Sequence, residues 1–94
     1  KGHTFFWRGL ALSLRGQHRE ASEFLDLALT LGTGALWESQ ARWRLAGALE
    51  ATGRSKRART ELAKLAATGI RDRWTEMARE KLKTPADGKK GTTP

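Results

Sequence analysis

Few side chains in this sequence are of a type that could do acid–base, nucleophilic or metal chemistry. The chain has no cysteine, which excludes a thiolate nucleophile and a Cys-ligated metal. Its two histidines, His3 and His18, have no third ligand and no carboxylate pattern near them. Because a metal site needs several ligands at a defined spacing, both histidines are expected at exposed loop or helix-end positions.

Two pairs of carboxylates, Glu20 with Glu23 and Glu76 with Glu80, are spaced to share one side of a helix. Both pairs fall on the polar side of an expected helix, where nothing distinguishes them from ordinary surface carboxylates. No phosphate-binding loop of the Gly-x-x-x-x-Gly-Lys type occurs in the sequence. The sequence therefore predicts a non-enzymatic protein without a cofactor or a metal.

The four tryptophans are candidates for a binding surface. Trp37 and Trp74 fall on apolar stripes with helical spacing, which predicts that they belong to the core. Trp43 lies on a different side of its helix from the core stripe, and Trp7 lies between the two apolar sides of the first helix. Trp7 and Trp43 are therefore the tryptophans expected to contact a partner.

Length and charge limit both the fold and the partners. A chain of 94 residues forms one domain with a modest core. The net charge is +8, and residues 1–47 contain six basic and four acidic side chains, whereas residues 48–94 contain twelve and six. Nucleic acid, anionic lipid or an acidic protein surface would be attracted to the second half.

No apolar run is long enough to span a membrane, and the N-terminal residues do not form a signal peptide. The compartment stays open between cytoplasm and periplasm. Because the chain starts without Met, we expect it to be a fragment of a longer protein. The leading hypothesis places it at the C-terminal end of a bacterial protein.

Five helices are expected to position these side chains. Apolar periodicity predicts them at residues 4–15, 19–31, 35–52, 56–67 and 73–83. Residues 1–83 are expected to form the domain, and residues 84–94 a disordered tail that has nothing to bury.

Glycines and small polar residues predict where these helices start and stop. Gly16 is expected to end the first helix and Gly69 the fourth, because glycine adopts a positive φ at the least cost. Thr33, Ser55 and Asp72 are expected as N-caps of the third, fourth and fifth helices.

The stretch 16–29 is repeated in weaker form at 53–66. In both copies a Gly is followed by an Ala five residues later, a Leu four residues after that, and another Ala or Leu three further on. The matched positions are Gly16 and Gly53, Ala21 and Ala58, Leu25 and Leu62, and Ala28 and Leu65. This spacing puts the three apolar residues on one side of a helix. The chain is therefore expected to contain two helix–turn–helix units.

The unit resembles the tetratricopeptide repeat, a pair of antiparallel helices of about 34 residues. The first copy matches the family pattern at Phe5, Gly9, Leu12, Gly16, Ala21, Leu25 and Ala28, and the second at Leu45, Ala46, Leu49, Gly53, Ala58 and Leu62. Arg8 and Arg42 stand where the family usually has a large apolar residue. The period here is 37 residues, which implies extra residues near Thr33 or in a longer third helix.

The resemblance implies an all-α fold, an α-solenoid of two repeats with the fifth helix as a cap. In this family the first helix of each pair lines the inner, concave surface. Carried over to this sequence, that surface comprises Phe6, Trp7, Leu10, Ser13, Leu14, Gln40, Trp43, Arg44, Gly47 and Glu50. An amphipathic helix or an extended peptide with apolar anchors would suit it. Phe6, Trp7 and Trp43 replace the Lys and Asn of the family's carboxylate clamp, which argues against that mode of binding.

A basic run, Arg54, Lys56, Arg57 and Arg59, opens the expected fourth helix. Positive charge at a helix N-terminus opposes the macrodipole, so local helix stability does not explain the run. Two interpretations stay open: contact with nucleic acid, anionic membrane or an acidic partner, or a solvated face. No aromatic residue is interleaved with the run, which argues against sequence-specific nucleic-acid recognition.

The first helix is apolar on two sides, and only one can be covered by the second helix. The other side is expected to meet a preceding repeat, a second copy of the chain, bound partner or solvent. The sequence as a whole favours a scaffold that binds a protein or peptide partner, including another part of its own longer chain. Electrostatic binding of nucleic acid or membrane is the alternative, and a regulatory domain attached to an enzyme is a third hypothesis.

Overall fold

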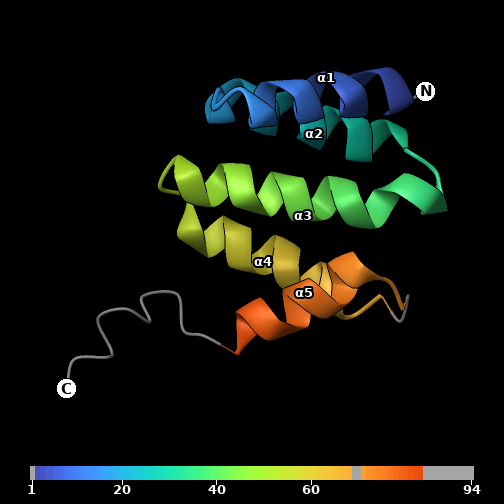
Figure 1. Ribbon diagram of the computed structural model, residues 1–94, viewed down its shortest axis with the longest axis vertical. Coiled ribbons are helices and arrows are strands. Elements are labelled where there is room, and N and C mark those ends of the chain that lie inside the picture. Colours follow the sequence, from blue (N-terminus) through green and yellow to red (C-terminus); the bar gives the residue numbers. More distant parts are fainter. Residues whose placement is uncertain (1, 69–70, 84–94) are drawn as a thin grey trace.

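A computed structural model describes residues 2–68 and 71–83 of the chain (Figure 1). This part contains five helices and no strand: α1 (Gly2–Leu14), α2 (His18–Leu31), α3 (Ala35–Ala51), α4 (Ser55–Ala66) and α5 (Arg73–Leu82). The predicted all-α class is confirmed, and each predicted helix matches an observed one to within two residues at either end. Gly69, the expected end of the fourth helix, and the expected tail at 84–94 lie outside the described residues.

The five helices form a stack in which consecutive helices run antiparallel (Figure 1). Each helix packs against the next, and α1 also contacts α3, which in turn contacts α5. These three alternate helices therefore adjoin one another, and we call their shared surface the α1/α3/α5 face.

Small side chains let the helices of each pair approach closely. Ala21 on α2 and Ala58 on α4 have no exposed surface, and Leu25 and Leu62 are buried beside them. Gly9 on α1 serves the same purpose, because a Cβ there would lie only 2.7 Å from Leu25 Cγ. The residues whose spacing defines the repeat in the sequence are thus residues of the hydrophobic core.

The turns that follow α1 and α3 have the same backbone geometry. Gly16 has a φ of +82° and Gly53 a φ of +83°. After each glycine, the next backbone N–H donates to the carbonyl five residues earlier, at 2.9 Å from Gln17 and 2.8 Å from Arg54. This is the Schellman pattern, in which glycine carries the positive φ that ends the helix. The two copies seen in the sequence therefore share a turn as well as a core stripe.

Two of the three predicted N-caps are wrong. The Schellman turn after α3 makes Arg54 the N-cap position, so Ser55 is already the first residue of α4. Gly34, with a φ of +87°, takes the N-cap position of α3. Thr33 is buried, and its hydroxyl donates to the Gly34 carbonyl at 3.1 Å.

The third cap, Asp72, is confirmed. Its carboxylate accepts a hydrogen bond from the Thr75 backbone N–H at 2.8 Å, which satisfies a free donor of the first turn of α5. Burial alone would raise the pKa of Asp72, but hydrogen bonds, with that from the Thr75 N–H foremost, lower it below its ordinary value.

Candidate partner-binding face

Most of the residues predicted to contact a partner keep some exposed surface, although Leu10 and Trp43 also pack against the core. Trp7 is 48% exposed and Leu14 is 70% exposed. Gly47 is exposed too, and five more are half-buried: Leu10, Gln40, Trp43, Arg44 and Glu50.

Phe6 is a correction to the predicted surface, because its side chain is fully buried. Its ring lies 5.0 Å from the Trp7 ring and 5.7 Å from the Trp37 ring, measured between centroids. Phe6 is buried because α3 packs against this side of α1 and covers the ring.

Trp7 and Trp37 join α1 to α3 at one end of this face. Their ring centroids are 5.1 Å apart in an edge-to-face arrangement, which is favourable for aromatic pairs. Trp37 is half-buried and packs against the core, as predicted. Trp7 covers this contact and leaves about half of its own surface in water.

An open hollow lies along the contact between α3 and α5. Trp43 and Met77 supply its apolar floor, with Glu76, Glu80 and Lys81 around them, and this shallow hollow has a volume of about 500 Å³. A narrower recess of about 70 Å³ adjoins it, lined by Trp43, Ala46, Gly47, Glu50, Leu62 and Lys81. We call the two together the α3–α5 hollow. It brings together Trp43, Gly47 and Glu50, which the sequence had assigned to one surface.

The residues that α5 contributes to the hollow were missed by the sequence interpretation. All four, Glu76, Met77, Glu80 and Lys81, fall in the fifth helix, which was expected only as a cap. The order of the helices could have predicted this contribution. Because α5 is the next alternate helix after α1 and α3, part of it borders the same face.

Each carboxylate of the hollow has a cationic neighbour. Glu50 pairs with Lys81 across the hollow at 3.3 Å. Glu76 pairs with Arg79 at 3.1 Å, and Glu80 pairs with Lys83 at 3.2 Å, both within α5. All these side chains are at least 36% exposed. Ion pairs in water contribute little stability, so these charges can exchange partners.

Arg44 is occupied by an aromatic contact at the start of α5. Its guanidinium carbon lies 5.8 Å from the centre of the Trp74 ring, and that of Arg73 lies 5.1 Å from it. Trp74 is half-buried and packs against the core, as predicted. Arg44 therefore joins α3 to α5 as well as bordering the face.

Three arginines of the basic run contact other helices of the stack. Arg54 donates to Ser22 Oγ on α2 at 2.9 Å, and Arg57 donates to Asp26 on the same helix at 2.6 Å. Arg59 donates to the Leu82 carbonyl of α5 at 3.1 Å. Lys56 is exposed. Contacts with other helices thus account for Arg54, Arg57 and Arg59, whose positive charge near the start of α4 does not stabilise that helix locally.

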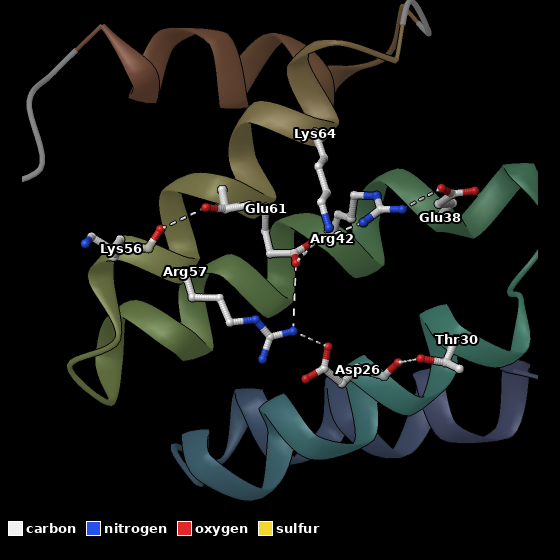
Figure 2. Close-up of polar contacts among 9 residues, drawn as sticks. Asp26, Thr30, Glu38, Arg42, Lys56, Arg57, Glu61 and Lys64 are labelled. Carbon is white, nitrogen blue, oxygen red and sulfur yellow. Dashed lines mark hydrogen bonds and ion pairs between the residues drawn. The ribbon is translucent and has the colours of Figure 1, made fainter.

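One buried carboxylate lies close to three basic side chains, as Figure 2 shows. Glu61 on α4 is 4% exposed, and its carboxylate lies 3.1 Å from Arg42, 3.8 Å from Arg57 and 3.7 Å from Lys64. Arg42 also pairs with Glu38 at 3.1 Å. Arg42 stands where the repeat pattern has an apolar residue, and this network takes the place of the apolar contact expected there. The network joins α3 to α4 and, through the contact of Arg57 with Asp26, also to α2.

Within residues 2–68 and 71–83, no three His, Asp or Glu side chains are grouped in a way that could hold a metal ion. None of the helices in these ranges has the length and apolar character of a membrane span.

No protein-family model, curated protein or solved structure matches the chain. The tetratricopeptide resemblance therefore stays a prediction, which depends on this chain's own repeated residues and on its two equivalent turns.

Proposed function

We propose that this protein is a non-catalytic interaction module that binds a peptide or helical segment of a protein partner on its α1/α3/α5 face. A tetratricopeptide-like solenoid, in which alternate helices line the inner groove, is part of the proposal. The observation that carries it is the α3–α5 hollow, where Trp43 and Met77 form an open apolar floor.

The side chains of the hollow are of the types that dominate binding energy at protein interfaces. Tryptophan is enriched among the residues whose truncation costs the most affinity, particularly in pockets that lose their water on binding. Methionine is flexible and adapts to different apolar partners. An apolar side chain seated against Trp43 and Met77 would remove both from water.

The exposed apolar residues of α1 extend the same face beyond α3. Trp7 and Leu14 are among the most exposed large apolar side chains of the described residues. A segment laid across the face from α5 to α1 would cover them together with the hollow. An amphipathic helix, with anchors spaced along one side, fits such a surface.

The proposal is tested with peptides selected by the full chain from a displayed library of random sequences. We expect selected peptides to bind the wild-type protein in solution. Trp43→Ala should weaken that binding about tenfold or more, which corresponds to at least about 1.4 kcal/mol. The matched control is Leu27→Ala, which truncates a 40%-exposed side chain on α2 and should leave the affinity unchanged.

Two results would contradict the proposal. One is that no peptide is enriched, or that the enriched peptides bind Trp43→Ala as tightly as the wild type. The other is tight binding of duplex DNA or anionic vesicles that does not depend on Trp43 and falls steeply with salt. That second result would support the electrostatic alternative predicted from the basic half of the chain.

A further inference from the structure

We infer that the stack bends toward the α1/α3/α5 face, and that Arg54 and Arg57 fix this bend by bridging α4 to α2. The two arginines are thus positioning residues for the face on which a partner is proposed to bind. The geometry of this inference depends on the contacts between helices, and its consequence for binding rests on the proposed function.

The two rows of alternate helices differ in how closely they approach one another. In one row, α1 comes within 8 Å of α3, and α3 within 8 Å of α5, measured between Cα atoms. In the other row, no Cα atom of α2 lies within 8 Å of a Cα atom of α4, and both of these helices are described in full. A stack whose helices are closer together in one row than in the other curves toward the closer row. The α1/α3/α5 face is then the inner side of the curve.

The gap between α2 and α4 is polar and is bridged by arginine side chains. A hollow of about 290 Å³ opens there, with Asp26, Arg57 and Glu61 in its lining. Arg57 extends across the gap from α4 and donates to Asp26 on α2 at 2.6 Å (Figure 2). The hydrogen bond with Asp26 is also the main reason why the pKa of Arg57 is raised. Arg54 makes a second bridge, to the hydroxyl of the buried Ser22 at 2.9 Å.

Each arginine is also bound on its own side of the gap. Arg54 Nε donates to Thr52 Oγ1 at 3.2 Å, and the Arg57 guanidinium lies 3.8 Å from the Glu61 carboxylate. A guanidinium can bind two partners at once, because its donors are fixed in one plane. Each side chain therefore acts as a spacer of set length between α4 and α2.

The placement of the two bridges restricts more than one distance. Ser22 and Asp26 are about one helical turn apart on α2. Exposed polar contacts contribute little free energy one by one, but bridges that are a turn apart limit both the separation of α4 from α2 and its sliding along α2. Positive charge at the start of α4 is unfavourable for that helix itself. The bridges give these arginines a reason to be there.

A distance measurement across the gap tests the geometry. Because the chain has no cysteine, spin labels can be attached specifically at Glu23→Cys on α2 and Ala63→Cys on α4, both at exposed positions. Double electron–electron resonance then gives the distribution of distances between the labels. Arg54→Met/Arg57→Met keeps long side chains and removes both bridges, so this distribution should shift and broaden.

Two further variants complete the distance measurement. Arg15→Met/Lys56→Met is the matched control, because it removes two positive charges at exposed positions, and its distribution should equal that of the wild type. Asp26→Ala removes one bridge from the α2 side and should shift the distribution in the same direction as the double arginine variant. Circular dichroism and melting temperature verify that each variant is folded.

Peptides selected by the wild type test the consequence for binding. Arg54→Met/Arg57→Met should bind them about threefold or more weakly, because mutations remote from a site change its affinity through such a shift of helices. The control Arg15→Met/Lys56→Met should bind them as the wild type does.

The outcomes separate this inference from the proposed function. An unchanged distribution of label distances in Arg54→Met/Arg57→Met and in Asp26→Ala overturns the inferred role of the bridges. A changed distribution together with unchanged peptide affinity overturns the claim that the bridges position the binding face. Peptides that do not require Trp43 overturn the proposed function alone, because the distance measurement uses no peptide.

Discussion

Two glycines on neighbouring helices illustrate how differently the same residue is used in this protein. Gly9 allows α1 to approach Leu25 of α2, whereas Gly47 faces open space beside the hollow. The sequence placed Gly9 among the residues that match the repeat. It also placed Gly47 on the binding surface, but only coordinates show that no neighbour requires glycine there.

The two glycines should respond in opposite directions to the same substitution. Gly47→Ala should raise the free energy of unfolding by about 0.5–1 kcal/mol, because alanine restricts the unfolded chain and favours the helix. Gly9→Ala should lower it by about 1–3 kcal/mol through overpacking against Leu25. Urea denaturation of both variants measures the difference. A destabilised Gly47→Ala variant would show that an unrecognised packing constraint acts at Gly47.

Asp72 links a single residue to the stability of α5. Asp72→Ala should destabilise the protein by about 1 kcal/mol at pH 7 through loss of the N-cap. Because the pKa of Asp72 is lowered in the folded state, its charge-dependent contribution is complete above the ordinary carboxyl pKa. It is lost as the pH falls through the lowered value.

Denaturation at several pH values measures this effect. The gap in stability between wild type and Asp72→Ala should be widest near neutrality and should narrow below about pH 4. Asp72→Asn keeps a good capping residue without the charge, so its stability should lack this pH dependence. An unchanged gap at low pH would contradict the cap's ionic character.

At the scale of helices and turns, the sequence was most informative where local rules act. Apolar periodicity placed all five helices, and glycine placed the turns after α1 and α3. The predicted caps at Thr33 and Ser55 were wrong because a neighbouring turn, and not the side chain, decides which residue becomes the cap. The partners of Arg54, Arg57 and Arg59 were not predictable, because each partner lies on another helix and depends on how the stack is assembled.

The pairing of helices has its own test in the alanines at the crossings. Ala21→Leu or Ala58→Leu should destabilise the protein by about 1–3 kcal/mol, because both residues are fully buried and have no room for a larger side chain. Ala63→Leu on the exposed side of α4 is the matched control and should change the stability by less than about 0.5 kcal/mol. A neutral Ala21→Leu or Ala58→Leu variant would contradict close helix packing at that crossing.

At the scale of the whole molecule, the stack combines a basic chain with an apolar hollow that is bordered by exposed ion pairs. Net charge and its distribution along the chain could be read from the sequence, but the ion pairs that form in the fold could not. Three arginines of the basic run are engaged within the stack, while carboxylates from α3 and α5 meet beside Trp43. The face that we propose for binding therefore differs in character from the molecule around it.

The most direct test of this assignment is a paired measurement on Trp43→Ala. We measure its melting temperature, and we measure its affinity for peptides selected by the wild type. If Trp43 serves mainly to bind a partner, the affinity should fall about tenfold or more, and the melting temperature should fall by only a few degrees. Unchanged affinity together with a large drop in melting temperature would show that Trp43 belongs to the core and would contradict the proposed binding face.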